Sequence, residues 1–564
     1  MKKIYTSMIA LSLGAFCGLT LSAQEMTEKP VYNETTSTEY DDLISAVAAV
    51  ADNDVIVLKG DVTLSSGRID LPGKTFTIKS ADAENQAKII RADNNVDKLF
   101  FLIKDAATNV TIQDVIIDGN NVAATNSDVE ANNGGTLILS NVVFENCTHD
   151  NGRVINFKGN ANVYLTDVKM NNCSVSTNDG YIYVRNNGND KLYLSGDNLV
   201  SVNIPNDWRI FVDKPLTNTV PIDLYVPENR ATLTKKAVVL NTKEFTKFRF
   251  VNNPAICLWP KNGTGNELNV NESSVCNETT QTGWYAFNDA VNYAADNDVI
   301  ALLTDVETEG GVTVSGKSVV VKGGVTEARG AVDGHSITLT KSNRFFLVNG
   351  GGSLSLENLV CDGNNMERNG SFFEAAGDGN QGGTLNMTDV ELTNFKSTHN
   401  QGVVAVKNNA KANLENVSVT NSTVPENRGE IFVGNNNVSL SGNNSLSLYV
   451  EGERHINVSD LTNVEPLTVI LQNSSEERSS VINGTTETSL FNVLSADGNN
   501  VDIKSDGENN IIVGTPVPTA IDEIGVDGED APVEYYNVQG IRVENPEHGL
   551  YIKRQGNKVS KVIL

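Results

Sequence analysis

The 564-residue sequence lacks a long internal hydrophobic run, a surplus of basic residues and any cysteine cluster. Beyond the N-terminus, no stretch reaches the roughly 18 apolar residues that a membrane-spanning helix needs. Lys and Arg number 43 against 70 Asp and Glu, which gives a net charge of −27. This charge would repel nucleic acid, an anionic membrane, and an acidic glycan unless cations bridged the two. No CxxC pair or His/Cys cluster of metal-ligand spacing is present, so a zinc site is not expected.

Aromatic residues are also scarce, at 6%, whereas glycine reaches 46 residues and asparagine is abundant. This mixture is typical of short strands separated by many turns. A chain of this length is expected to form two or three domains.

The N-terminus predicts a cleaved secretory signal over residues 1–23. Lys2 and Lys3 precede an apolar run, and Ser22-Ala23 offers small residues for cleavage. A short buried helix fits less well because the run is not amphipathic. The bulky residue before Cys17 argues against a lipoprotein. Removal of the signal leaves five cysteines, an odd number, so at least one thiol stays free in an oxidising compartment.

The sequence contains a long internal duplication. The clearest matches are Asn-Glu-Thr-Thr, Asp-Asn-Asp-Val-Ile and Asp-Gly-Asn-Asn, which begin at residues 33, 52 and 118 and recur 244 positions later. Each copy opens with apolar residues at helical spacing, an acidic turn and a β-branched run, which predicts a short helix and first strand capping a stacked sheet. The predicted boundaries are 24–274 and 275–515, followed by a terminal segment at 516–564.

A finer repeat of about 26 residues lies inside each copy. Its lines place an apolar residue first, Asp or Asn two positions later, then an apolar residue and another two beyond, and are followed by turn residues. Strands at this period, joined by turns too short for crossover helices, can pair in parallel only by coiling into a β-solenoid. A β-sandwich is the alternative, but it does not explain the fixed period. The predicted core columns are Ile112/Leu139/Leu165 and Ile117/Phe144/Met170, with turn ladders at Asn146/Asn172 and Asn394/Asn421.

These features resemble the pectate-lyase-like superfamily of right-handed parallel β-helices. The resemblance rests on the capping pattern at 46–58 and 290–302 and on lines ending in Asp-Gly-Asn-Asn. It covers about 480 residues and implies the fold, but no reaction. Rungs such as 143–155 also resemble, loosely, repeats of polymorphic outer-membrane adhesins.

The terminal segment resembles the C-terminal sorting domain of proteins exported by type IX secretion. The runs 534–543, 549–552 and 556–564 carry this resemblance, and basic residues here contrast with the acidic body. It implies a small β-sandwich that directs passage across the outer membrane of a gram-negative bacterium and attachment to the cell surface. An ordinary terminal hairpin module is the alternative.

No catalytic motif of the superfamily can be assigned. A lyase needs carboxylates for Ca²⁺ and a Lys or Arg base, and a hydrolase needs paired acids. Asp114 and Asp167, with Asn141 between them, are interpreted as a turn ladder. The nearest bases are Arg153, Lys158 and Arg185, with the second-copy counterparts Val403, Asn408 and Gly434.

Other candidates are few. His149 and His399 hold matching turns and are interpreted as exposed turn histidines, with a general base as the alternative. Asp118 and Asp362 offer a Ca²⁺ site, although their Asp-Gly-Asn-Asn sequence is explained as a tight turn. The candidates for stacking on sugars are Tyr181, Tyr183 and Tyr193, of which Tyr183 matches Phe432 and Tyr193 matches Ser439.

Cys147 and Cys173 lie 26 residues apart at corresponding rung ends. Stacked rungs would place their Cα atoms about 4.8 Å apart, within reach of a disulfide. Cys361 takes the core position of Ile117 and is predicted to be a buried free thiol.

Two function classes therefore remain open. The first is a non-catalytic, surface-attached adhesin or glycan-binding scaffold with an extracellular glycan or surface partner. The second is a polysaccharide lyase or glycoside hydrolase with a groove in one helix. Duplication of the whole helix and the absence of a catalytic motif favour the first, so we expect no certain cofactor, with Ca²⁺ as the one candidate.

Overall fold

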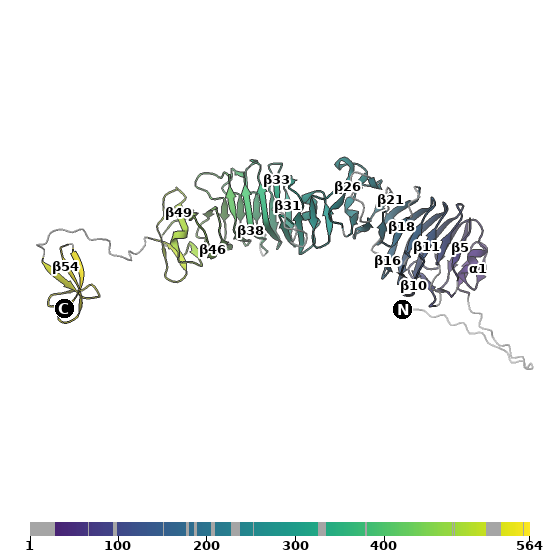
Figure 1. The fold of residues 1–564 in the computed structure, drawn as a ribbon, viewed down its shortest axis with the longest axis horizontal. Coiled ribbons are helices and arrows are strands. Elements are labelled where there is room, and N and C mark those ends of the chain that lie inside the picture. The colour runs from purple at the N-terminus through teal and green to yellow at the C-terminus, as the bar shows by residue number, and fades with distance from the viewer. Residues whose placement is uncertain are drawn as a thin grey trace, which may run out of the picture. The chain divides into compact units, whose positions relative to one another are not determined.

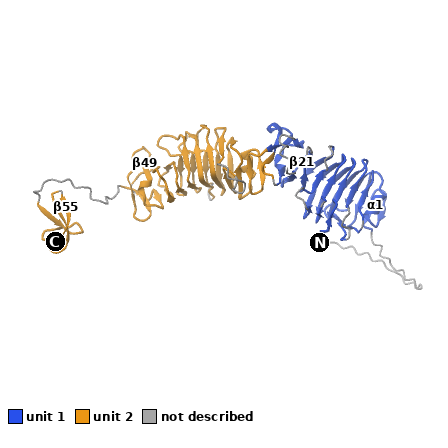
Figure 2. Cartoon of the chain, viewed as in Figure 1, with its two compact units in different colours: residues 1–252, 258–271 blue, residues 253–257, 272–564 orange. Residues whose placement is uncertain are grey.

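The computed structural model describes residues 29–65, 67–93, 99–150, 152–175, 180–184, 189–204, 209–226, 237–251, 253–324, 334–377, 381–475, 478, 480–514, 532–556 and 558–564. The predicted signal segment and Arg185 lie outside these residues. The chain divides into two compact units, 1–252 with 258–271 and 253–257 with 272–564 (Figure 2). Both consist almost entirely of short strands stacked in parallel sheets, so each unit is a β-solenoid (Figure 1).

The main sheet of the first unit contains fifteen strands. In sheet order its path is β2 (Thr38–Tyr40), β1 (Val31–Asn33), β3 (Asp54–Leu58), β6 (Thr75–Ser80), β9 (Asn109–Asp118), β12 (Thr136–Glu145), β15 (Asn162–Thr166), β19 (Lys191–Gly196), β21 (Ile210–Leu216), β23 (Ala237–Leu240), β26 (Glu267–Glu272) and β25 (Ile256–Pro260). Pairing beside this path are β4 (Val62–Leu64), β7 (Ala87–Arg91) and β16 (Lys169–Asn171).

Two further sheets close the rungs of the first unit. The larger one runs through β5 (Ile69–Leu71), β8 (Phe101–Ile103), β11 (Val129–Ala131), β14 (Ile155–Phe157), β18 (Ile182–Val184), β20 (Ser201–Asn203), β22 (Ile222–Tyr225) and β24 (Phe248–Phe250). The smaller one comprises β10 (Ala123–Ala124), β13 (Thr148–His149) and β17 (Ser174–Val175).

The second unit repeats this plan. Its main path is β28 (Thr282–Trp284), β27 (Val275–Asn277), β29 (Asp298–Leu302), β32 (Ser318–Lys322), β35 (Ser353–Asp362), β38 (Thr384–Thr393), β41 (Lys411–Glu415), β44 (Val438–Gly442), β46 (Ile456–Leu461), β48 (Ile482–Asn483), β51 (Asn510–Val513) and β50 (Ile503–Ser505), with β30 (Val306–Thr308), β33 (Ser336–Leu339) and β42 (Ser418–Thr420) beside it. The other sheets are β31 (Val312–Ser315), β34 (Phe346–Asn349), β37 (Phe373–Ala375), β40 (Val404–Val406), β43 (Ile431–Val433), β45 (Ser447–Val450), β47 (Leu467–Leu471) and β49 (Phe491–Ser495), and the pair β36 (Glu367–Arg368) and β39 (Lys396–Ser397).

The pairing register confirms the predicted core columns. Leu139 lies opposite Ile112 on one side and Leu165 on the other, and Phe144 lies between Ile117 and Met170, all in parallel and all buried. A β-sandwich is excluded because its strands pair antiparallel, whereas successive rungs here pair parallel. Each rung therefore buries its alternate side chains directly above those of its neighbour.

Asparagine and aspartate form the corners of the rungs. Asp114, Asn141 and Asp167 take left-handed backbone angles, with φ between 52° and 55°, which these two residue types tolerate best. The Asn141 side-chain amide donates to Asp114 Oδ1 at 2.8 Å. At the next corner the Asn172 amide donates to Asn146 Oδ1 at 2.7 Å. The predicted turn ladders are thus present in the first unit.

The sequence motifs that open each copy form the caps of the two units. Helices α1 (Leu43–Ala48) and α2 (Phe287–Asn292) follow β-hairpins at the start of each unit, and α1 begins at Asp42, whose carboxylate accepts from the Ser45 amide. In the first unit the buried Asn33 side-chain amide donates to Asp54 Oδ2 at 2.8 Å. The corresponding bond in the second unit is 2.7 Å long. No helix among the described residues is long and apolar enough to cross a membrane.

Short 3₁₀ turns complete the fold at η1 (Phe245–Lys247), η2 (Lys261–Gly263) and η4 (Thr488–Leu490).

Close contacts between neighbouring rungs explain the glycine of the repeated Asp-Gly-Asn-Asn turn. A Cβ atom at Gly119 would lie 2.6 Å from the carbonyl oxygen of Asn146 on the next rung, so only glycine fits there.

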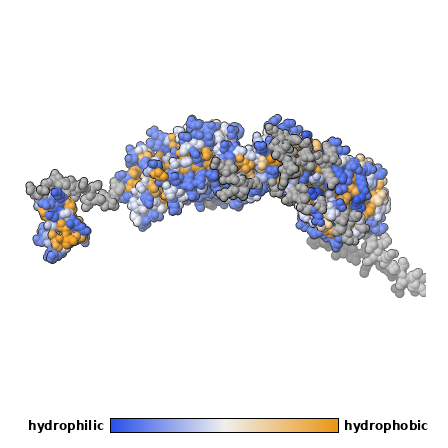
Figure 3. All heavy atoms as spheres, viewed as in Figure 1, coloured by the Kyte–Doolittle hydropathy of each residue, from blue (hydrophilic) through white to orange (hydrophobic). Residues whose placement is uncertain are grey.

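The terminal segment forms one four-stranded antiparallel sheet of β53 (Arg542–Val543), β52 (Val533–Tyr536), β54 (Leu550–Gln555) and β55 (Lys558–Ile563). The sequence predicts a small sandwich here, and within residues 532–556 and 558–564 there is a single layer. Apolar side chains stand exposed on it, among them Leu550, Val559 and Ile563. Figure 3 shows apolar atoms gathered on this sheet.

Candidate functional site

The Asp118 and Asp362 carboxylates each accept hydrogen bonds from their own turn and from an asparagine on the next rung. Asp118 Oδ1 accepts from the Asn120 amide at 2.8 Å and the Asn146 side chain at 3.0 Å. Burial works against ionisation of Asp118, but these hydrogen bonds and the Lys88 ammonium outweigh it and lower its pKa. Asp362 makes the matching bonds to Asn364 and Asn394. Among the described residues no three His, Cys, Asp or Glu side chains group as metal ligands would.

The register corrects two of the predicted counterparts. Ile155 pairs with Val129 in the first unit, and Val404 pairs with Phe373 at the equivalent position of the second unit. Arg153 lies two residues before Ile155, so it corresponds to Gly402 rather than Val403. By the same register Lys158 corresponds to Lys407, whose ammonium lies 3.0 Å from Glu374. The alignment made from the sequence was shifted by one residue here, so it did not show that both units have a lysine at this position. In the second unit this lysine forms an ion pair.

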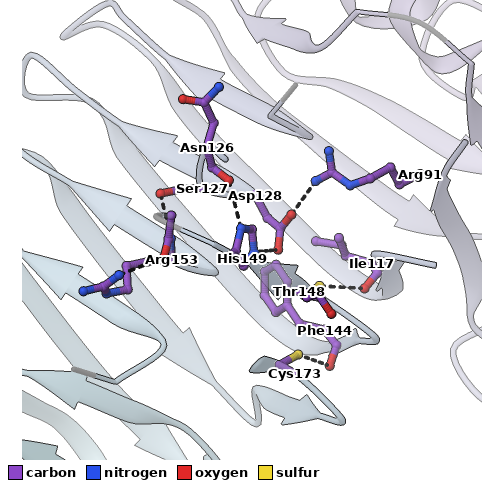
Figure 4. A network of polar contacts seen from close by, with 12 residues as sticks. Arg91, Ile117, Asn126, Ser127, Asp128, Phe144, Thr148, His149, Arg153 and Cys173 are labelled. Carbon is purple, nitrogen blue, oxygen red and sulfur yellow. Dashed lines mark hydrogen bonds and ion pairs between the residues drawn. The ribbon is translucent and has the colours of Figure 1, made fainter. Parts of the chain in front are cut away.

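The prediction for His149 is wrong. It is not an exposed turn residue: Arg91, Asp128 and His149 are each no more than 2% exposed and form one buried network inside the first unit (Figure 4). Asp128 lies between the other two, with Arg91 Nη2 2.5 Å from Oδ1 and His149 Nε2 2.8 Å from Oδ2. The Arg91 guanidinium also lies over the Phe100 ring at 4.6 Å. His149 therefore has an acidic partner, but both are closed off from solvent.

Both ring nitrogens of His149 lie against oxygen atoms. Its Nδ1 lies 2.9 Å from the Asn126 carbonyl oxygen, which can only accept. Its Nε2 lies 2.8 Å from Asp128 Oδ2, and the other carboxyl oxygen of Asp128 faces the Arg91 guanidinium. The buried Asp128 side chain thus has a polar partner on each of the two neighbouring rungs.

The second unit fills the same volume with apolar side chains. Asp128 corresponds to Phe372, since each backbone carbonyl accepts from the two amides of a phenylalanine pair on the preceding rung. The register likewise matches Arg91 with Leu339 and His149 with Ser397, not His399. The result is a cluster of phenylalanine rings with centroids 4.8–6.1 Å apart, made of Phe345, Phe372, Phe373 and Phe395.

The two predicted neighbouring cysteines lie beside this network. Thr148 and Ser174, the residues after them, pair in parallel, and the Ser174 amide donates to the Cys147 carbonyl at 2.8 Å. The predicted register is therefore present, with both side chains buried as free thiols. Cys361 is also a fully buried thiol, and burial raises its pKa.

A pocket of about 440 Å³ opens on the first unit next to Cys173. Tyr181 and Tyr225 line it together with an ion pair in which Arg249 Nε lies 2.5 Å from Asp223 Oδ1. The Tyr181 hydroxyl donates to the Cys173 carbonyl at 2.9 Å. Burial raises the pKa of both tyrosines, so their hydroxyls stay protonated at neutral pH. The pocket thus combines aromatic rings with paired charges, as small-ligand sites often do.

The second unit has a pocket of the same volume at the equivalent rungs. The equivalence follows from one shared bond: the Tyr181 amide donates to Ser201 Oγ, and the Glu430 amide donates to Ser447 Oγ. Here the Glu430 carboxylate accepts from the Ser447 hydroxyl, and Glu465 adds a second acid. The position recurs, but the aromatic and guanidinium lining does not.

The other two candidate tyrosines lie outside this pocket. The Tyr193 ring is stacked between Tyr164 and Phe211, with centroids 4.3 and 5.3 Å away. The Tyr183 ring lies under the Arg153 guanidinium at 5.5 Å. Both rings therefore already have partners within the unit.

Sequence reasoning missed Arg91, Asp128, Asp223, Tyr225 and Arg249. A signal for the first two was present, because each stands where the second copy has an apolar core residue. The pocket residues gave no such signal, since they come from rungs 20 to 26 residues apart that only stacking brings together.

No family model, curated protein or solved structure matches this chain.

Proposed function

We propose that this protein is a non-catalytic scaffold at the bacterial cell surface that binds neutral glycans through the pockets of its solenoid units. The observation that carries the proposal is the recurrence of one pocket, of about 440 Å³, at equivalent rungs of both units. The sequence motifs that recur in both units form the caps, the rung corners and the core. The pockets also recur, and the fold does not require them.

The lining of the first pocket suits a sugar. Tyr181 and Tyr225 offer apolar ring surface for the C–H face of a pyranose, and Asp223 with Arg249 offers acceptors and donors for its hydroxyls. The ion pair leaves the pocket without net charge, and the acidic chain repels anionic polymers. A neutral glycan is therefore the favoured ligand class.

The surface location is supported by the two ends of the sequence. Residues 1–23 carry the features of a secretory signal, and 516–564 resemble a type IX sorting domain. Deletion of 516–564 is expected to leave the protein in the periplasm, which fractionation and surface labelling would detect. Surface display by the truncated chain would remove this part of the proposal.

The binding test uses the full mature chain on an array of neutral and acidic glycans, followed by calorimetry on the best ligand. Tyr181→Ala should weaken binding at least about tenfold, since 1.4 kcal/mol of lost contact gives that factor. Tyr193→Ala is the matched control, because it removes a half-buried tyrosine of the same unit outside the pocket. Equal loss in both variants, or no neutral ligand, would contradict the proposal.

The enzyme class is tested with the same protein. Incubation with pectate, alginate and glycosaminoglycans, with or without Ca²⁺, should release no unsaturated or reducing sugar. Turnover abolished by Arg153→Ala or Arg185→Ala in a folded protein would establish the lyase or hydrolase instead.

A further inference from the structure

Cys147 and Cys173 occupy adjacent rungs but meet different surroundings. Cys147 is 1% exposed and lies behind the rung corner, next to the buried Asp128. Cys173 is 9% exposed and forms part of the wall of the pocket that opens beside Tyr181. One thiol of the pair can therefore meet a small molecule, and the other can meet only its neighbour.

The sulfur environments differ in the same direction. A hydrogen bond from the Cys147 thiol lowers the pKa of Cys173 despite partial burial. The same bond, burial and the Asp128 carboxylate raise the pKa of Cys147. The thiolate is the nucleophile in thiol chemistry, so the thiol at the pocket is also the one that ionises first.

We propose that Cys173 and Cys147 form a two-cysteine redox site that exchanges with small disulfides through the pocket of the first unit. The Cys173 thiolate attacks one sulfur of the small disulfide, which breaks its S–S bond, forms a mixed disulfide on Cys173 and releases one thiolate. Cys147 then loses its proton to the released thiolate and attacks Cys173 Sγ. This step forms the Cys147–Cys173 bond and releases the second thiolate, which takes up the proton that Cys173 lost on ionising.

The overall reaction balances. The protein dithiol loses two electrons and two protons, and the small disulfide is reduced to two thiols. The residues after the cysteines pair in register, and neighbouring parallel strands lie about 4.8 Å apart, so the second attack needs no refolding of the rung.

The fold does not require this pair. The second unit has Phe395 and Ser422 at the same rung-end positions, after the corner residues Asn394 and Asn421. The two cysteines are therefore present in one unit alone, next to the pocket that has the tyrosines. The inference does not depend on glycan binding, because it concerns the pocket wall and a different chemistry.

The test exposes the reduced full chain to oxidised glutathione and follows each cysteine by intact and peptide mass spectrometry. In Cys147→Ser, a mixed disulfide should accumulate on Cys173, at least about 100-fold faster than on Cys361, because thiolate fraction governs the rate. In the unmodified chain the mixed disulfide should be transient and the Cys147–Cys173 disulfide should appear. In Cys173→Ser, Cys147 should stay unmodified.

Cys361 also serves as a folding reporter, since it becomes reactive only if the second unit opens, and hydrogen exchange resolved by peptide reports the first unit. A second variant, Tyr181→Trp, narrows the pocket without touching either sulfur and should slow modification of Cys173 at least about fivefold. Modification of Cys147 in Cys173→Ser at the unaltered rate would overturn the proposal. So would a Cys173 that reacts no faster than Cys361, or an oxidised native protein whose disulfide no small thiol reopens.

Discussion

The two solenoid units share one backbone register and place opposite chemistry at the same rung ends. The first unit buries Arg91, Asp128 and His149 where the second buries Leu339, Phe372 and Ser397. Replacing a buried ion network by well-packed apolar residues is often neutral or stabilising. The comparison therefore shows that this solenoid does not need the charges for its fold, and that their presence in one copy calls for a reason beyond stability.

The outer faces differ in the same way. On the main sheet of the first unit Tyr164, Tyr193 and Phe211 form an aromatic stack. The equivalent positions of the second unit hold Asn413, Ser439 and Asn457, and Asn413 donates to the Asn386 side chain of the previous rung at 2.8 Å. Stacked rungs can therefore carry either a column of aromatic rings or a column of polar side chains on this face, since both can repeat at the spacing of the strands.

The largest expected effect comes from Asp128→Ala. It removes the carboxyl group that Arg91 Nη2 and His149 Nε2 share in the core, which should cost about 3–5 kcal/mol in the free energy of unfolding of the first unit. Urea titration with hydrogen exchange would measure the loss and assign it to this unit. The matched control installs the second unit's residues together, Arg91→Leu, Asp128→Phe, Cys147→Phe and His149→Ser, and should stay within about 2 kcal/mol. A loss below 1 kcal/mol for Asp128→Ala would show that the network is not coupled.

The corner ladder should give an intermediate effect. Asn146→Ala puts a Cβ-bearing residue without a polar side chain at φ 55° and removes bonds to Asp118 and Asn172, so we expect a loss of about 2–3 kcal/mol. Asn146→Gly keeps the backbone angle and should lose less. Asn394→Ala is the equivalent change in the second unit. If it costs nothing, the two corners do not have the same role.

Exchanging the outer ladders should have a small effect. Tyr193→Ser, which installs the residue of the second unit, should cost about 1 kcal/mol, because it removes ring contacts on both sides. A double-mutant cycle with Tyr164→Ser isolates the contact. Additivity within about 0.3 kcal/mol would mean that the stack contributes nothing.

The smallest expected effect is the labelling of the Cys361 thiol, which is the reference for the reactivity of Cys147 and Cys173 in the first unit. Burial raises its pKa, so below that pKa the thiol is protonated and inert, and raising the pH from 7 to 9 should not expose it. Cys173, whose pKa is lowered, should react in that range. Maleimide labelling of native protein checks both, and rapid labelling of Cys361 would show that the second core is open.

The sequence predicted the fold closely because the fold is a repeat. The 26-residue period, the alternation of apolar residues and the Asn and Asp corners each follow from local geometry, so columns such as Ile112/Leu139/Leu165 could be read from one copy. The alignment of the copies failed by one residue at Arg153 and by two at His149, where a loop differs in length. In a strand-based fold a one-residue slip, as at Arg153, changes which face a side chain occupies.

The duplication, the solenoid rungs, the caps and the adjacency of Cys147 and Cys173 could be predicted from the sequence, since each depends on spacing along the chain. The tertiary structure was needed to show that His149 is buried against Asp128, that Arg91 reaches the same carboxyl group from the preceding rung, and that Cys173 lines a pocket while Cys147 does not. Contacts of that kind depend on which side chains a rung turns inward and on the depth to which the stack covers them. Neither quantity is encoded in the spacing of residues along the chain.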